Sequence, residues 1–130
     1  MPNNLILAVD FDGTIVTHEY PAIGRPVPRA LECLRKWQQQ GVRIVLWTMR
    51  SGESLAQAVA YLERNGIELF GVNENREQTT WSQSPKAYAH AYIDDAAVGC
   101  PLRQMIGVAR PIVDWVVVEP LVEDILRQYQ

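Results

Sequence analysis

The sequence predicts an α/β protein with helices on both faces of a central parallel sheet. Short, continuous apolar runs alternate with stretches whose apolar residues recur at helical spacing. Continuous apolarity is typical of strands buried on both faces, as in a parallel sheet. Three such runs separated by two helical patterns give the order βαβαβ, with right-handed crossovers. The chain has 130 residues, the size of one domain, so we expect a single domain over residues 1–130.

The first half of the chain carries the clearest elements. We expect strands at three apolar runs, residues 5–9, 42–47 and 67–72. We expect helices between them, over residues 28–40 and 51–65. Pro28 suits a first helical position, Gly41 follows the first helix as a stop, and Ser51 can cap the second.

The second half is less regular. Ser84 and Pro85 predict the start of a short helix over residues 84–88. A fourth strand is expected at residues 91–93. A last helix is expected over residues 114–128. Pro120 would kink or split this helix, so Glu119 is an alternative start.

Composition and charge exclude several classes of protein. The 12 basic and 15 acidic residues give a net charge of −3, and no lysine and arginine cluster is present, which argues against binding to extended nucleic acid. No apolar stretch is long enough to cross a membrane, and the N-terminus lacks the basic flank of a secretory signal. Cys33 and Cys100 show no metal-binding spacing and are expected to be free thiols, so we expect a cytoplasmic protein.

Residues suited to phosphate chemistry follow the expected strands. They are Asp10 and Asp12 after the first strand, Thr48 after the second, and Asp94 and Asp95 after the fourth, with Lys86 upstream of the last pair. In parallel sheets the carboxyl ends of the strands share one edge, so we expect these groups to meet there.

Four crowded carboxylates repel one another unless a cation neutralises them. Hard oxygen ligands favour Mg²⁺, which also offsets the negative charge of a phosphate ester. We therefore expect Asp10, Asp12, Asp94 and Asp95 to hold Mg²⁺. Asp10 can then attack phosphorus, and Asp12 can protonate the leaving oxygen and later activate water.

Further residues are candidates for contacting the phosphorylated substrate. Gly13 permits a sharp turn that aims backbone N–H groups at phosphoryl oxygens, and Lys86 supplies positive charge. Arg50 is a substrate-binding candidate, with an ion pair at the surface as the alternative. The expected substrate contacts are Gly13, Thr14, Thr48, Met49, Arg50 and Lys86.

These residues resemble the four motifs of the haloacid dehalogenase (HAD) superfamily. The matching segments, in the family's order, are DFDGT (10–14), LWTMR (46–50), SPKAY (84–88) and YIDD (92–95). The resemblance implies a three-layer Rossmann-like fold and Mg²⁺-dependent phosphotransfer. It implies that Asp10 is the nucleophile, and that Asp12 is the acid and base and gives its backbone carbonyl to the metal. Thr48 and Lys86 would hold the phosphoryl group, and Asp94 and Asp95 would hold the metal directly or through water, in an order left open.

Members of this superfamily usually carry a cap domain over the site. The segments at residues 15–27 and 73–84 are too short to fold separately, so we expect a capless member with an open site. An open site suits a large substrate, or a second copy of the chain serving as a lid. Trp47, Trp81 and Trp115 are candidates for such an interface, with a place in the core as the alternative.

The leading hypothesis is thus a phosphatase acting on a phosphorylated substrate of unidentified class. A dehalogenase would not need Asp12, and a phosphomutase would need a cap. A receiver domain would need an aspartate after the third strand, where the sequence has Asn73. A noncatalytic phosphate-binding or assembly protein on the same fold remains as the alternative, because a fold does not determine function.

Overall fold

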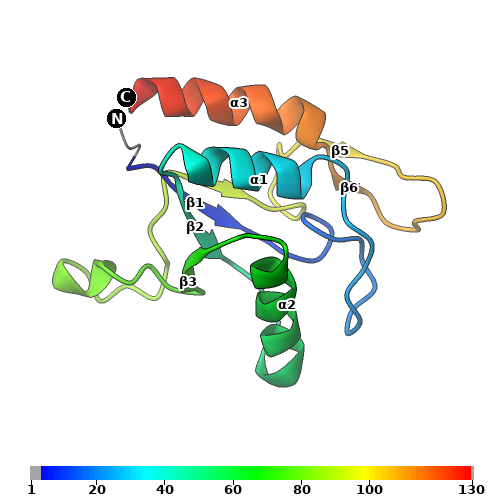
Figure 1. Ribbon diagram of the computed structural model, residues 1–130, viewed down its shortest axis with the longest axis horizontal. Helices are drawn as coiled ribbons and strands as arrows, with labels where there is room; N and C mark the ends of the chain where they lie inside the picture. The colour runs from blue at the N-terminus through cyan, green and yellow to red at the C-terminus, as the bar shows by residue number, and fades with distance from the viewer. Residues whose placement is uncertain (1–3, 130) are drawn as a thin grey trace.

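The structure is a computed structural model that describes residues 4–129. Its central sheet has four parallel strands in the order β3-β2-β1-β4 (Figure 1). The strands are β1 (Ile6–Val9), β2 (Arg43–Leu46), β3 (Leu69–Val72) and β4 (Ala91–Ile93). Val9 at the end of β1 pairs with Leu46 of β2 on one side and with Ile93 of β4 on the other. The carboxyl ends of these three strands therefore lie side by side.

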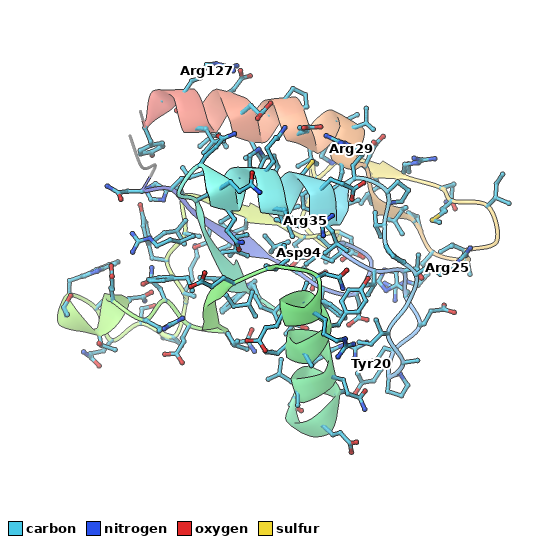
Figure 2. All side chains as sticks on the ribbon, in the orientation of Figure 1. Tyr20, Arg25, Arg29, Arg35, Asp94 and Arg127 are labelled. Atoms are coloured by element: carbon cyan, nitrogen blue, oxygen red, sulfur yellow. The ribbon has the colours of Figure 1, made fainter. Side chains whose placement is uncertain are left out.

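Three α-helices contribute their buried residues to one large core. They are α1 (Ala30–Gln39), α2 (Gly52–Arg64) and α3 (Trp115–Gln128). Alternate residues of β1 and the segment before it, including Leu7 and Val9, belong to the same core. Figure 1 shows α1 and α3 stacked together, and the Trp37 and Trp115 rings join them at 6.2 Å between centroids. Arg29, labelled in Figure 2, lies at the start of α1 and pairs with Glu119 of α3 at 2.8 Å. One face of the sheet is thus covered by helices.

The opposite face has a different cover from the one expected. Ile6, Ala8, Val45 and Ala89 form a small cluster there, with Trp47 and Phe70 partly buried against it. Residues 73–90, which join β3 to β4, contain only a short 3₁₀ helix, η1 (Gln78–Thr80). The expectation of α-helices on both faces is therefore corrected, because an irregular segment forms the layer on this side.

The helix expected over residues 84–88 is also absent, and the buried side chain of Gln78 explains why. Its amide donates to the carbonyls of Ser84 and Lys86 at 3.2 and 2.8 Å, and its oxygen accepts from the Tyr88 N–H at 2.7 Å. These bonds satisfy backbone groups that a helix would pair internally.

The C-terminal part begins with an unexpected antiparallel pair, β5 (Leu102–Arg103) and β6 (Ile112–Val113). Helix α3 then starts after Asp114 and continues through Pro120, so the alternative start at Glu119 is wrong. Pro120 has no N–H to donate to the carbonyl of Val116, one turn earlier in the helix. Both residues are exposed, so solvent can reach this carbonyl.

The α/β class, the parallel sheet and its four expected strands are confirmed, and the arrangement is consistent with a Rossmann-like fold. Among residues 4–129, no helix combines the length and the apolarity that a membrane span requires.

Candidate active site

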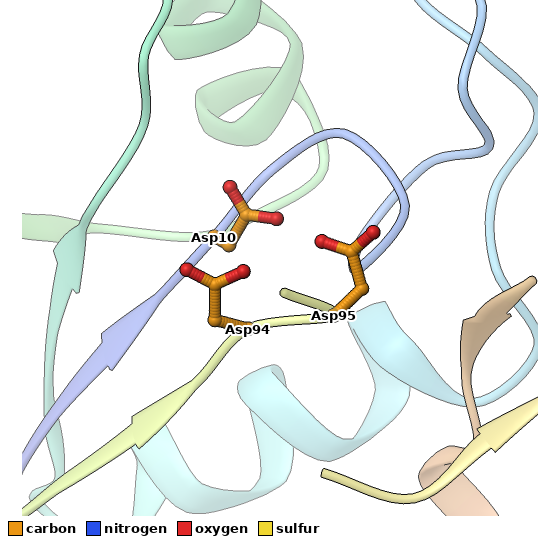
Figure 3. A group of neighbouring side chains, drawn as sticks. All are labelled: Asp10, Asp94 and Asp95. Carbon is orange, nitrogen blue, oxygen red and sulfur yellow. The ribbon is translucent and has the colours of Figure 1, made fainter. Parts of the chain in front are cut away.

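Three carboxylates converge at the carboxyl edge of the sheet (Figure 3). Asp10 directly follows β1, and Asp94 and Asp95 directly follow β4. The Asp10 N–H donates to the Ile93 carbonyl at 2.9 Å, which aligns the two strand ends. One carboxylate oxygen from each aspartate lies within 4.8 Å of the others. The expected meeting of these three residues is confirmed.

The charge on this cluster is not balanced within it. Burial, a hydrogen bond with Asp95 and the charge of Asp94 raise the pKa of Asp10 to about 8. The Thr14 hydroxyl opposes this shift by donating to Asp10 Oδ2 at 2.9 Å. Three ionised carboxylates at this spacing need a cation, and an all-oxygen donor set fits a hard divalent ion such as Mg²⁺.

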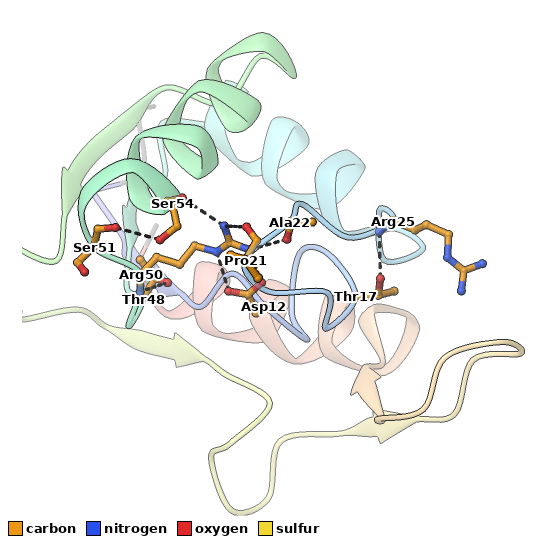
Figure 4. Close-up of polar contacts among 9 residues, drawn as sticks. All are labelled: Asp12, Thr17, Pro21, Ala22, Arg25, Thr48, Arg50, Ser51 and Ser54. Atoms are coloured by element: carbon orange, nitrogen blue, oxygen red, sulfur yellow. Dashed lines mark hydrogen bonds and ion pairs between the residues drawn. The ribbon is translucent and has the colours of Figure 1, made fainter.

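Asp12 lies two residues from Asp10 but faces a different partner, Arg50 (Figure 4). Arg50 Nε and Nη2 donate to the two oxygens of Asp12, each at 2.8 Å. The remaining donors of the guanidinium bind three backbone carbonyls, those of Pro21, Ala22 and Ser54. The carboxylate of Asp12 is thus turned to Arg50 and is not part of the carboxylate cluster.

Arg50 itself differs from both expectations. The residue is only 3 % exposed, so it is neither a surface ion pair nor open to a substrate. Its guanidinium carbon lies 5.0 Å from the Phe11 ring centroid and 5.1 Å from that of Tyr20. Arg50 therefore anchors the loop after β1 to the start of α2.

The sharp turn expected at Gly13 is present, and Gly13 and Thr14 are both engaged within the protein. Gly13 has a φ of +84°, and a Cβ there would overlap the His18 imidazole. Its N–H donates to the Val16 carbonyl at 2.6 Å and is engaged within the loop. The buried Thr14 hydroxyl accepts from the Asp95 N–H at 3.2 Å, so it links Asp95 to Asp10. Both residues shape the carboxylate cluster, whereas direct contacts to substrate had been expected.

Two residues missed as site residues lie beside this cluster. His18 Nε2 is 2.9 Å from Asp95 Oδ2. Asn73, which follows β3, has a φ of 55° and accepts the Thr48 N–H on its Oδ1 at 2.8 Å. An Asn after an expected strand end is a usable signal for the second residue, because Asn tolerates the left-handed region.

Two open cavities, of about 290 and 440 Å³, meet at the cluster and share Asp10, Thr48, Met49 and Asp94. Thr48 and Met49 therefore lie where the prediction required, and Met49 is 97 % exposed. The larger cavity also includes Asp12, His18, Tyr20, Arg50, Asp95, Ala96 and Arg110. Arg110 adds an exposed positive charge to its rim.

Lys86 is not brought to the carboxylates. Its ammonium lies 5.4 Å from the Tyr92 ring centroid, and it lines a separate cavity of about 300 Å³ with Trp81 and Tyr88. The placement follows from the absent helix, since Gln78 binds the Lys86 carbonyl and holds this segment irregular. Of the three tryptophans considered, Trp115 is in the core, Trp47 is half-buried and Trp81 is 63 % exposed.

A solved structure resembles this chain over nearly its whole length. It is that of a conserved protein coded by a locus of Bacteroides thetaiotaomicron, with 35% sequence identity and a TM-score of 0.77. The match covers 94% of this chain and 92% of that one. The chain belongs to the same family as this Bacteroides protein. No protein-family model matches the chain, and no curated protein matches it. The family likeness therefore extends to the whole fold, beyond the strand ends that form the site.

Proposed function

We propose that this protein is a capless, HAD-type phosphatase that hydrolyses phosphate monoesters with the help of Mg²⁺. The observation that carries the proposal is the convergence of Asp10, Asp94 and Asp95 at the ends of two adjacent parallel strands. Such a set has little structural use, because it places like charges together in a partly buried position. The open cavities beside it leave room for a phosphorylated substrate.

Asp10, Asp94 and Asp95 would hold the Mg²⁺ ion. The ion supplies positive charge, which keeps these carboxylates ionised and offsets the charge of the phosphate ester. The ionised Asp10 carboxylate then attacks phosphorus, and the bond between phosphorus and the leaving alcohol oxygen breaks. Water next attacks the aspartyl-phosphate on Asp10, which releases inorganic phosphate and restores the carboxylate.

Asp12 would give a proton to the leaving oxygen and later take one from the attacking water. Both of its oxygens accept hydrogen bonds from Arg50, so these steps require Asp12 to turn from Arg50 toward the phosphoryl group and to take up a proton from solvent before it donates one. Thr48 lines both cavities and would contact the phosphoryl oxygens. A direct role for Lys86 would require residues 84–88 to move, whereas Arg110 already lines the larger cavity.

A noncatalytic phosphate-binding or assembly protein is the second candidate. The bidentate ion pair of Asp12 with Arg50 and the distant position of Lys86 favour it, because both remove an expected catalytic group from the cluster.

A panel of phosphate monoesters tests the proposal, with and without Mg²⁺, on the wild type, Asp10→Asn and the surface control Asp124→Asn. We expect Mg²⁺-dependent phosphate release by the wild type and the control, and near-complete loss in Asp10→Asn. Full activity in Asp10→Asn would contradict the mechanism. Phosphate binding without hydrolysis by the wild type would favour the noncatalytic candidate.

A further inference from the structure

The smaller of the two cavities differs in chemistry from the larger one. Besides the shared residues it is lined by Trp47 and Asn73, and it contains no basic side chain. The larger cavity has the exposed Arg110 on its rim, whereas its other arginine, Arg50, is buried and engaged by Asp12 and backbone carbonyls. A second anionic group on a substrate would therefore find no partner in the smaller cavity, whose charged lining residues are both aspartates.

Trp47 supplies a flat apolar wall. It follows β2 and packs with Val45 on the sheet face that no α-helix covers, where it is half-buried. Met49, on the same rim, is almost fully exposed. A half-buried indole and a flexible thioether form a surface on which a ring can stack.

Asn73 adds one oriented polar group. The Asn73 N–H donates to the Leu46 carbonyl at 2.7 Å, and its Oδ1 accepts the Thr48 N–H. These bonds fix which way the amide points and leave its Nδ2 group to donate to a ligand.

We infer that Trp47, Met49 and Asn73 bind the leaving group of the substrate, and that this group is an uncharged ring with a hydrogen-bond acceptor. This inference rests on the proposed phosphatase function. A volume of about 290 Å³ suits one ring system, since sites for drug-sized ligands begin at about 300 Å³. The phosphate sits at Asp10, which the two cavities share, and the ring lies against Trp47 with its acceptor toward Asn73 Nδ2.

Three phosphate esters of primary alcohols test this assignment. Pyridin-3-ylmethyl phosphate carries a ring with an acceptor, benzyl phosphate a ring without one, and glycerol 3-phosphate no ring. We expect kcat/KM to fall in that order for the wild type.

Two variants separate the ring from the acceptor. Asn73→Asp keeps an oxygen for the Thr48 N–H but loses the donor, so the preference for the pyridine ester over the benzyl ester should fall about fivefold. Its added charge acts on both esters alike and cancels in the ratio. Trp47→Leu should lower kcat/KM for both ring esters about tenfold relative to kcat/KM for glycerol 3-phosphate. Trp81→Leu, which is outside the cavity, should leave the ratios of kcat/KM among the three esters unchanged. Melting temperatures verify that each variant is folded.

The outcomes separate this inference from the proposed function. Hydrolysis of all three esters with equal kcat/KM, unchanged in both variants, would keep the phosphatase and overturn the ring site. If the wild type hydrolyses none of the three esters, the proposed function fails. Quenching of Trp47 fluorescence by pyridin-3-ylmethyl phosphate then tests whether the ring binds at this site. Quenching that disappears in Trp47→Leu would support it, and no quenching in the wild type would overturn it.

Discussion

Asp10 and Asp12 lie two residues apart on one loop, and their surroundings are opposite. Asp12 has both oxygens paired with the guanidinium of Arg50, whose remaining donors bind three backbone carbonyls. Asp10 faces Asp94 and Asp95, and its pKa is raised by burial and by these neighbours. The chain therefore supplies a counterion for Asp12 and leaves Asp10 to be neutralised by a proton or by an external cation.

In this structure the pair of Asp12 and Arg50 holds the loop after β1 in place, whereas the cluster around Asp10 is left without a counterion. A buried ion pair whose partners are all hydrogen-bonded fixes local geometry, and removal of one member is costly. A cluster of like charges lowers stability in the absence of a cation, and its retention is typical of a functional site.

The largest effect is expected for Arg50→Met. The substitution leaves Asp12 and three backbone carbonyls without their buried donor, and we expect a loss of about 3–5 kcal/mol in the free energy of unfolding, measured in urea. Arg127→Ala, which removes an exposed pair with Asp124, should change it by less than about 0.5 kcal/mol. Equal losses in both variants would contradict the structural role of Arg50.

Asp10→Asn is expected to stabilise the protein when no divalent cation is present. The pKa of Asp10 is raised from 3.8 to about 8 in the fold, so its contribution to stability is present below pH 3.8 and is lost as pH rises to about 8. The melting temperature of the variant at pH 8 with EDTA should exceed that of the wild type by a few degrees, about 2–8 °C.

Mg²⁺ should reverse this order, because it stabilises the wild type and not Asp10→Asn. The control Asp124→Asn should follow the wild type in both conditions. A wild type more stable than Asp10→Asn in EDTA at pH 8 would mean that the carboxylate cluster is balanced from within.

A smaller effect is expected for Thr14→Val. The Thr14 hydroxyl donates to Asp10 and accepts from the Asp95 N–H. Valine has nearly the same volume as threonine, so the substitution removes this hydrogen-bond partner from the Asp10 carboxylate and the Asp95 N–H with little change in packing. We expect about 1–2 kcal/mol of destabilisation in urea. The same substitution at the exposed Thr79, which is outside the site, should have little effect, and equal effects at the two positions would show that the hydroxyl of Thr14 does not connect the cluster.

The smallest effect is expected for Glu119→Gln. Glu119 joins α3 to α1 by accepting from Arg29 and Lys36, which lower its pKa to about 2. Its contribution is therefore present above pH 4.5 and lost as pH falls to about 2. Because solvent reaches these ion pairs, we expect Glu119→Gln to lower the free energy of unfolding by only about 1 kcal/mol at pH 7, measured in urea. Near pH 2 the variant and the wild type should have the same free energy of unfolding. A difference independent of pH would point to packing.

The carboxylate cluster was predictable because its geometry follows from topology. Asp10 and Asp94 each follow an apolar run, and parallel neighbours end at one edge of the sheet. The positions of Arg50 and Lys86 were not predictable in this way. Arg50 pairs with a residue 38 positions away, and no local pattern shows that its side chain is buried.

The predicted position of Lys86 depended on a helix over residues 84–88. The local sequence favours this helix, but tertiary contacts hold the segment in an irregular conformation. Ser84 and Pro85 form a valid helix start, yet the buried amide of Gln78 binds the backbone of the same segment. The strands β5 and β6 were missed because they have two residues each, too short for any alternation to be visible. Local propensity thus predicted long periodic elements and missed those decided by a single side chain or a short pairing.

Calorimetric titration of Mg²⁺ into the metal-free protein at pH 7 measures whether the carboxylate cluster takes up a cation in exchange for the Asp10 proton. We expect binding that releases close to one proton, because Asp10 gives up the proton that it holds without a cation. Titrations in buffers of different ionisation enthalpy measure this proton, and Asp10→Asn should bind weakly and release none. Absence of Mg²⁺ binding by the wild type, or binding without proton release, would show that the carboxylate cluster does not exchange the Asp10 proton for a cation.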